Sequence, residues 1–342
     1  MEFGVLVDPV ITASELIDLA QRLEGWGYTH FWYPDEKFFR ECYIGLTLVA
    51  ANTKSLQLGP CVTDPYSRHP IMTAAAMATL SEIAPGRTWL GLGAGGRGLS
   101  EIGITQDRPA KAIREAITII RGLLRGESVD FQGEIIQLRN RPLDFQPAND
   151  VRIMIGTGHG RFIQQLAGEV ADSAMLANYA SPETIRKALA WIEKGAQKAG
   201  KALSDLHLIS RVDVAIHADR LAARQAVAPK VLSAVRSSYP ELSYLDDLPP
   251  FDMTSEFVRV LGRKDYATKS YYANPAHSAP LIPPTLTDHL AVAGTPAEVT
   301  ERLQAIAEIG INQITIRAVP CEDQTMSESL ALIASHVLPK LR

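Results

Sequence analysis

Residues 56–91 read LQLGPCVTDPYSRHPIMTAAAMATLSEIAPGRTWLG, and this stretch contains one complete copy of the pattern that decides the fold. The short apolar runs at residues 56–59 and 88–91 are typical of buried β-strands. Between them, residues 70–83 are rich in alanine and methionine and begin with proline, which suits the first position of a helix. A strand, a helix and a second strand in this order predict a βαβ unit with parallel strands.

The same alternation of strand and helix continues along the chain. Short apolar runs predict eight strands, at residues 3–7, 30–33, 56–59, 88–91, 151–155, 171–176, 206–216 and 311–316. Near-continuous apolar strands that alternate with helices indicate a parallel sheet buried on both faces. Eight such units predict an α/β fold, a (β/α)8 TIM barrel with insertions at its C-terminal mouth; a doubly wound sheet is the alternative.

Local patterns add a few further elements to this scheme. The spacing of apolar residues predicts a helix over residues 112–124, and residues 129–138 predict a hairpin around Gln132 and Gly133. Thr295 and Glu298 have the spacing of a capping box, which predicts a helix start at this point.

The whole chain, residues 1–342, is predicted to form a single domain with one insertion. Segment 236–288 holds seven prolines and interrupts the alternation of strands and helices. It is too long for a plain connection between two elements. We therefore expect it to serve as a lid or as an element of an oligomer.

Composition excludes several classes of protein. The chain has 34 Lys and Arg against 38 Asp and Glu, a formal net charge of −4, and 46% hydrophobic residues. These values are ordinary for a globular protein and argue against a disordered chain and against a basic nucleic-acid-binding protein. No run approaches the ~18 apolar residues of a membrane span, and the first residues lack the features of a secretory signal. Three widely spaced cysteines, Cys42, Cys61 and Cys321, predict a reducing, cytoplasmic location, and no metal-ligand cluster is evident.

In a barrel the functional residues lie at the carboxyl ends of the strands. The second predicted strand is followed by Asp35 and Glu36, of which at most one should face the site because neighbouring residues on an extended backbone point opposite ways. A solvated charged loop is the alternative. The third strand is followed by the polar segment 61–70, in which a lone Cys61 is more often buried and inert than nucleophilic.

Glycines follow the next two predicted strands. Segment 91–96, GLGAGG, matches the GxGxxG dinucleotide pattern, but the next convincing helix begins only near Pro109, which argues against that interpretation. A loop that lets a flat ligand approach the backbone, or a plain tight turn, remains open. Segment 156–160, GTGHG, runs straight into a helix, so its N–H groups predict an anion site with Arg161 nearby; a simple glycine-rich helix start is the alternative.

At these four strand ends the sequence resembles the bacterial luciferase-like superfamily, and within it the group of coenzyme F420-dependent methylenetetrahydromethanopterin reductases. The resemblance rests on residues 58–70, 85–96, 166–172 and 293–296. It runs from residue 1 to about residue 235 and resumes near residue 285. It implies a barrel that holds a flavin or deazaflavin at its mouth, coenzyme F420 in the leading interpretation and FMN in the alternative.

The resemblance also implies roles for individual residues. A cis peptide bond would join Cys61 and Val62 behind the cofactor ring, and Asp35 would approach the ring edge. The cofactor would be lined by Asp35, Cys61, Val62, Thr63, Gly93, Ala94, Gly95, Gly156, Thr157, Gly158, His159 and Gly160. The last three of these would hold the phosphate of the cofactor tail. Glu36 and Asp35 are the candidate acid and base, and Tyr66, Arg68 and His69 are candidates for substrate or structural contacts.

Departures from the family pattern leave the substrate open. Glu36 stands where the reductases usually have histidine, and Cys61 where glycine is common. Related deazaflavin dehydrogenases carry a catalytic glutamate at the position of Ala94, so its absence argues against oxidation of alcohols or sugars. Segment 236–288 has no counterpart that can be placed.

These observations lead to three hypotheses. The first is an oxidoreductase that passes a hydride from reduced coenzyme F420 to an unsaturated or imine-like carbon of a small molecule. The second is an FMN-dependent monooxygenase of the same superfamily, and the third is a non-catalytic barrel that binds a similar ligand. In each case we expect a homodimer that acts without nucleic acid or membrane.

Overall fold

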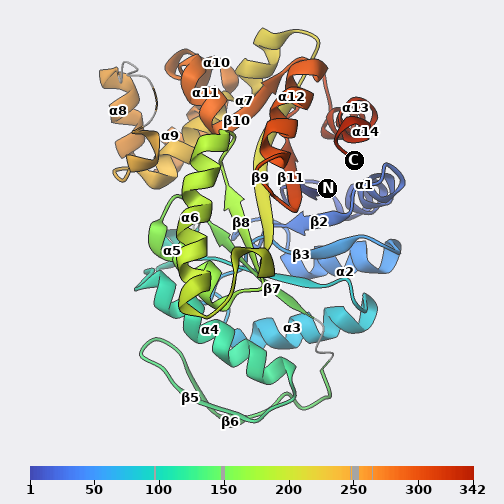
Figure 1. Cartoon of the computed structure of the whole chain (residues 1–342), viewed down its shortest axis with the longest axis vertical. Coiled ribbons are helices and arrows are strands. Elements are labelled where there is room, and N and C mark those ends of the chain that lie inside the picture. Colours follow the sequence, from blue (N-terminus) through green and yellow to red (C-terminus); the bar gives the residue numbers. More distant parts are fainter. Residues whose placement is uncertain (96–97, 148–150, 247, 249–253, 264) are drawn as a thin grey trace. The chain divides into compact units, whose positions relative to one another are not determined.

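The computed structural model describes residues 1–95, 98–147, 151–246, 248, 254–263 and 265–342. Eight parallel strands are joined in the hydrogen-bonded order β3-β2-β1-β11-β9-β8-β7-β4 (Figure 1). Isolated parallel bridges from β3 to Thr88 and from Thr63 to β4 join the two ends of this order. The eight strands are β1 Glu2–Leu6, β2 His30–Tyr33, β3 Gln57–Pro60, β4 Trp89–Leu92, β7 Arg152–Thr157, β8 Ser173–Ala177, β9 His207–Ile216 and β11 Gln313–Ala318. The predicted (β/α)8 barrel is confirmed.

Helices follow the strands as the sequence predicts. The longer ones are α1 Ala13–Gly25, α2 Cys42–Asn52, α3 Pro70–Ile83, α4 Pro109–Leu124, α5 Arg161–Val170, α6 Pro182–Lys198, α7 Arg220–Ser238, α12 Pro296–Ala307 and α13 Met326–His336, with the short α14 Leu338–Leu341 at the end. The predicted capping box of Thr295 and Glu298 opens α12. The predicted hairpin is also present, as β5 Val129–Gln132 and β6 Gln137–Arg141. None of the helices in the described residues is long and apolar enough to cross a membrane.

The chain divides into two compact units, which we describe separately. The N-terminal unit comprises residues 4–175 and 190–207, and the C-terminal unit comprises residues 1–3, 176–189 and 208–342. The four strand ends that carry every predicted site residue lie in the N-terminal unit. The assignment of residues 1–342 to a single domain stays a prediction.

Segment 236–288 belongs to the C-terminal unit and folds into short helices. Its described part contains α8 Ser255–Gly262, α9 Tyr266–Tyr271, α10 Pro275–Ser278 and α11 Pro284–Leu290, and the additional strand β10 Ala291–Gly294 follows it; residues 247, 249–253 and 264 lie outside the described part. Phe257 and Leu286 are buried in one cluster with Val227, Val231 and Val235 of α7. The segment therefore shares an apolar core with α7, and its proposed role as lid or oligomer element stays a prediction.

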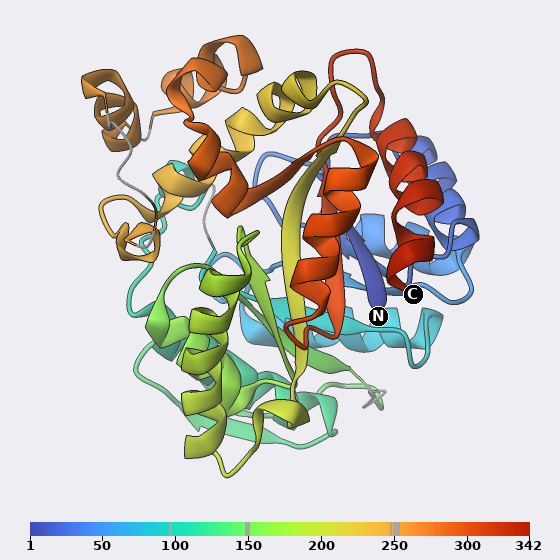
Figure 2. The same ribbon diagram turned by 45° about the horizontal axis from the view of Figure 1, so that its top comes forward.

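A buried ion cluster ties together the strands of the C-terminal unit. Arg317 on β11 lies opposite Asp213 on β9, and its Nε and Nη2 donate to the two carboxylate oxygens at 2.5 and 2.8 Å. Arg211 donates to the same carboxylate at 3.2 Å, and also to the side-chain oxygen of Asn178. Burial would raise the pKa of Asp213, but the guanidiniums of Arg317 and Arg211 hold it well below its ordinary value. In the same unit α12 and α13 lie beside β11 (Figure 2).

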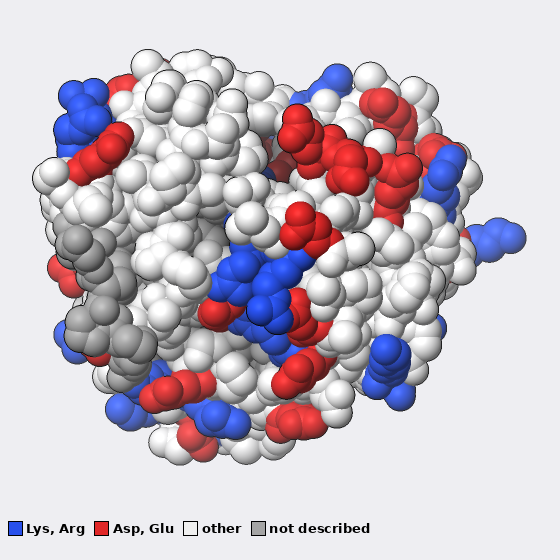
Figure 3. Space-filling model, turned by 90° about the horizontal axis from the view of Figure 1, so that it is seen from above, with Lys and Arg blue, Asp and Glu red and all other residues white. Residues whose placement is uncertain are grey.

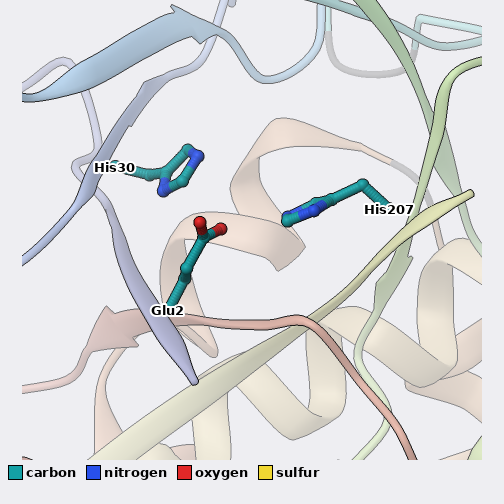
Figure 4. Close-up of side chains that lie close together, drawn as sticks. All are labelled: Glu2, His30 and His207. Carbon is teal, nitrogen blue, oxygen red and sulfur yellow. The ribbon is translucent and has the colours of Figure 1, made fainter.

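Two histidines of the N-terminal unit stack on each other, and each is the first residue of a strand. The rings of His30 and His207 face each other with centroids 6.2 Å apart (Figure 4). Trp32 and Trp89 also contact the His30 ring, with centroids 5.9 and 5.5 Å away. Burial, His207 and Arg152 together lower the pKa of His30 from 6.5 to about 3. His30 is therefore neutral in the folded protein at neutral pH.

This histidine predicts a specific loss of stability on acidification. The unfolded chain protonates His30 near pH 6.5 and the folded chain only near pH 3, so the unfolded state binds more protons in between. Stability therefore falls as the pH falls, by about 2–3 kcal/mol between pH 6 and pH 4 from this group alone. Urea unfolding at several pH values should show this slope in the wild type and a shallower one in His30→Asn.

The control for this prediction is His336→Asn, which removes an exposed histidine and should keep the wild-type slope. Equal slopes of unfolding free energy against pH for the wild type and His30→Asn would contradict the assignment of this loss of stability to His30.

Candidate functional site

The predicted site residues of the N-terminal unit gather where β2, β3, β4 and β7 end. β2 pairs with β3, bridges join β3 to β4, and β4 pairs with β7, all in parallel. The carboxyl ends of neighbouring parallel strands meet at one edge of the sheet. The segments that follow these strands, at residues 34–36, 61–69, 93–95 and 158–160, therefore line one edge.

The segment after β3 is attached to both neighbouring strands. The peptide bond between Cys61 and Val62 is cis, which confirms the prediction for this bond. The Cys61 N–H donates to the carbonyl of Tyr33 at 2.9 Å. The Thr63 N–H donates to the Gly91 carbonyl, and the Gly93 N–H donates back to the Thr63 carbonyl, each at 2.9 Å. The Cys61 thiol contacts the Met175 sulfur at 3.4 Å, so it faces an apolar neighbour.

Val62 explains two of the glycines that the sequence singles out. A Cβ on Gly93 or on Gly156 would overlap the γ-carbons of Val62 from either side. A Cβ on Gly91 would overlap the carbonyl of Pro60 in the same way. These glycines allow Pro60 and Val62 to pack closely against β4 and β7. The sequence alone did not suggest this packing role for the glycines.

The glycine segment after β4 is closed by a side chain rather than by a helix. The Gln106 amide donates to the carbonyls of Ala94 and Gly95 at 2.5 and 2.9 Å, and Gly95 has a left-handed φ of 72°. Gly96 lies outside the described residues. The next long helix, α4, begins at Pro109, as the sequence predicts. A dinucleotide site of the GxGxxG type requires a helix directly after its glycines, and among the described residues no α-helix begins between β4 and Pro109.

Asp35 contacts two side chains of the segment after β3. Its Oδ2 accepts from the Thr63 hydroxyl at 2.6 Å, and the Nε of Arg68 lies 3.5 Å from the same oxygen. Arg68 also pairs with Glu41 at 2.8 Å and lies over the Tyr43 ring, 4.6 Å from its centroid. The structure thus brings Asp35, Thr63 and Arg68 together, while the neighbouring Glu36 is half-buried on the same segment.

A second carboxylate, Asp64, organises the turn that follows. It is almost completely buried and accepts from the N–H groups of Tyr66 and Ser67 at 2.9 and 2.8 Å. Lys37 forms an ion pair with it across the strand ends. Burial would raise the pKa of Asp64, but hydrogen bonds from Lys37 and Ser67 keep it below its ordinary value. Lys37, Asp64 and Tyr43 were not predicted as site residues, although Asp64 has the position of an aspartate that caps a turn.

Tyr66 and His69 make structural contacts in this unit. The Tyr66 hydroxyl donates to the Asp107 carbonyl at 2.7 Å, and burial together with Asp107 and Asp64 raises the pKa of Tyr66 to about 12. His69 caps α3 through a bond from the Ile71 N–H to its Nδ1 at 3.3 Å, and its Nε2 lies 3.2 Å from the Gln137 carbonyl. Tyr66 and His69 were expected to make either substrate or structural contacts, and these bonds are of the structural kind.

The segment after β7 leads into an open helix start. The Thr157 hydroxyl donates to the Met175 carbonyl at 3.1 Å, so its side chain is hydrogen-bonded within the sheet. α5 begins at Arg161 with Gly160 as its N-cap and has no side-chain cap. A Cβ on Gly158 or Gly160 would meet open space. The first N–H groups of a helix lack partners within the helix and carry its positive dipole end, so this start suits an anion.

Charged side chains of both signs occupy the face of the molecule in Figure 3. Basic side chains gather near the middle of this view and acidic ones lie beside them.

Comparisons with known proteins identify similar chains. The family model described as luciferase-like monooxygenase matches residues 1–313. The 5,10-methylenetetrahydromethanopterin reductase of Archaeoglobus fulgidus is 31% identical over 345 residues, which cover 100% of both chains. Among solved structures, the coenzyme F420-dependent tetrahydromethanopterin reductase of Methanopyrus kandleri superposes with a TM-score of 0.83 at 22% identity, over 100% of this chain and 99% of that one. A monooxygenase of Streptomyces bottropensis superposes with a TM-score of 0.70 at 20% identity, over 100% of both chains.

Proposed function

This chain belongs to the luciferase-like monooxygenase family, and from that premise we propose that it is an oxidoreductase that uses coenzyme F420. Its reaction would be the transfer of a hydride to an unsaturated or imine-like carbon of a small organic substrate. The observation that carries the proposal is the pairing of two features at one edge of the N-terminal unit. Val62 is held between Gly93 and Gly156, and the open start of α5 follows the same strand as Gly156.

These residues fit a deazaflavin with a phosphate-bearing tail. Val62 presents an apolar side chain fixed on both sides, which suits the face of a flat ring. Thr63, Ala94 and Gly95 flank it through the hydrogen-bonded turns after β3 and β4. At the start of α5, Gly158, His159 and Gly160 would hold the phosphate through backbone N–H groups.

When bound, coenzyme F420 supplies the hydride, and the protein supplies position and a proton. Asp35 accepts a hydrogen bond from Thr63 and lies beside Arg68, so we assign it the positioning of this edge of the site. Glu36 follows it directly and is half-buried, and we assign it the donation of the proton to the substrate. Cys61 contacts Met175 and has no part in the redox chemistry of this proposal.

The competing function is an FMN-dependent monooxygenase, which the similarity to the Streptomyces bottropensis enzyme favours. The two functions differ in their use of oxygen, because a reduced flavin activates oxygen whereas a reduced deazaflavin transfers a hydride. A homodimer and a cytoplasmic location, both expected from the sequence, stay predictions.

The test is a turnover assay of the full chain with two reductants, reduced coenzyme F420 and reduced FMN. With reduced coenzyme F420 and cyclohexenone, an activated alkene, we expect the deazaflavin absorbance to return and no oxygen to be consumed. With reduced FMN we expect no enzyme-dependent oxygen uptake. Oxygen consumption with FMN, together with no oxidation of reduced coenzyme F420 by cyclohexenone or by an iminium acceptor, would overturn the proposal.

A further inference from the structure

Two exposed aromatic side chains follow the candidate proton donor at a distance of two and three residues along the chain. Phe38 is 74% exposed and Phe39 is 43% exposed, and they follow Glu36 and Lys37 in the segment after β2. We call Phe38 and Phe39 the aromatic pair. Exposure of two phenylalanine rings loses the hydrophobic stabilisation that their burial would provide, so the pair needs an explanation.

The backbone holds the aromatic pair in an unusual conformation. Phe38 has a φ of 67°, in the left-handed region that bulky side chains rarely adopt. Residues on both sides of the pair are tied down. Lys37 is paired with the buried Asp64, and Arg40 donates to the Val10 carbonyl at 2.7 Å. A strained conformation that its surroundings enforce is typical of ligand clamps and active sites.

The Phe38 ring extends from the end of β2 to the loop after β4. A Cβ on Gly98 would lie 3.2 Å from the Phe38 ring, so the ring packs directly against this glycine. Asp64, at the end of β3 between these two strands, anchors the neighbouring Lys37. The aromatic pair therefore lies at the same strand-end edge as Val62 and Thr63, within the N-terminal unit.

From this placement we propose that the aromatic pair is the substrate-recognition platform of the site, and that it stacks on a flat conjugated ring of the substrate next to Glu36. The inference rests on the proposed function and adds to it the class of substrate, a molecule whose reducible bond belongs to or adjoins a planar ring. Offset or edge-to-face contact with a phenylalanine ring recognises this class through its π-face, which saturated molecules lack.

Charge argues for a small ligand rather than a second protein chain as the occupant. Glu36, Lys37 and Arg40 flank the aromatic pair within five residues of chain. The buried cores of protein interfaces are depleted in charged residues, whereas ligand sites combine aromatic walls with a few polar groups. The pair with its adjacent carboxylate has the composition of a ligand site.

The experiment uses two probes that share a carbon skeleton and a charge but differ in planarity, naphthoate and decahydronaphthoate. Calorimetric titration of both into the chain loaded with coenzyme F420 should show tighter binding of naphthoate. Phe38→Ala should weaken naphthoate binding about three- to tenfold, the value of one aromatic contact, and leave decahydronaphthoate binding unchanged. Phe38→Trp should retain the tighter binding of naphthoate. This result would show that Phe38→Ala acts through loss of the aromatic ring and not through loss of the fold.

The control variant is Tyr266→Ala, which removes a 78% exposed aromatic side chain from α9 and should bind both probes as the wild type does. Equal affinity of the wild type for both probes, or naphthoate binding unaffected by Phe38→Ala, would overturn the platform. A concentration-dependent dimer that Phe38→Ala abolishes, with no change in probe binding, would also overturn the platform. The aromatic pair would then be an interface between copies of the chain. Titration of coenzyme F420 itself distinguishes the two proposals. A wild-type chain that binds no coenzyme F420 refutes the proposed function. A chain that binds coenzyme F420, but whose naphthoate binding is unchanged by Phe38→Ala, refutes only the platform.

Discussion

Replacing Glu36 with glutamine should lower kcat for the oxidation of reduced coenzyme F420 by cyclohexenone about 10²–10⁴-fold, the contribution of a positioned general acid. Glutamine keeps the size of the side chain but cannot deliver the proton. Affinity for coenzyme F420 should remain that of the wild type, because Glu36 is placed against the substrate and not against the cofactor. The measurement is steady-state turnover combined with a cofactor titration of the same variant.

A matched variant, Glu82→Gln, removes an exposed carboxylate from α3 and should leave turnover unchanged. Glu36→Asp should recover part of the activity, because the acid is retained at a greater distance. A Glu36→Gln variant with wild-type kcat would refute the role of Glu36. A parallel loss of cofactor affinity would show instead that Glu36 supports the site structurally.

Replacing Asp213 with asparagine should destabilise the C-terminal unit by about 3–5 kcal/mol, because it leaves the guanidiniums of Arg211 and Arg317 without their counter-charge in a buried place. Asp213 is 1% exposed and accepts from both arginines, whereas asparagine preserves its shape and removes its charge. Urea unfolding monitored by circular dichroism at neutral pH should show the midpoint shift to lower denaturant.

The pH dependence gives this prediction a second readout. The folded pKa of Asp213 is held below its unfolded value, so its contribution to stability is fully present above the unfolded value of about 3.9 and is lost as the pH falls below it. The difference between the wild type and Asp213→Asn should therefore be constant from neutral pH to about pH 5 and should shrink below about pH 4. Asp18→Asn, which breaks the exposed pair with Arg22 on α1, should cost only about 0.3–0.5 kcal/mol. An equally small cost for Asp213→Asn would contradict the account of the buried cluster.

The alternation of apolar runs was sufficient to predict the barrel, because its strands are largely buried and helices such as α1 and α4 carry a clear apolar face. The predicted helix at residues 70–83 coincides with α3, where Pro70 marks the start. The elements α8 to α11 and β10 were not predicted. They are four to eight residues long, which is too short for a reliable periodic pattern, and residues of α8, α11 and β10 are buried in one cluster with α7.

The candidate site could be predicted only as a set of segments. The resemblance to a known family implied the cis bond between Cys61 and Val62, and the glycines before α5 indicated an open helix start. The contacts that organise the site join residues far apart in the chain, such as Lys37 with Asp64 and Arg68 with Glu41. Sequence spacing carries no information about such pairs. The exposure of the aromatic pair could not be predicted either, since a phenylalanine next to a strand is normally buried.

The central claim is that the edge formed by Val62 and the start of α5 holds a deazaflavin with an anionic tail. Equilibrium titration of the full chain with coenzyme F420 and, separately, with FMN tests it most directly. The account predicts that one coenzyme F420 binds per chain at micromolar concentration and that FMN binds more weakly. Tight binding of FMN with no detectable binding of coenzyme F420 would contradict it.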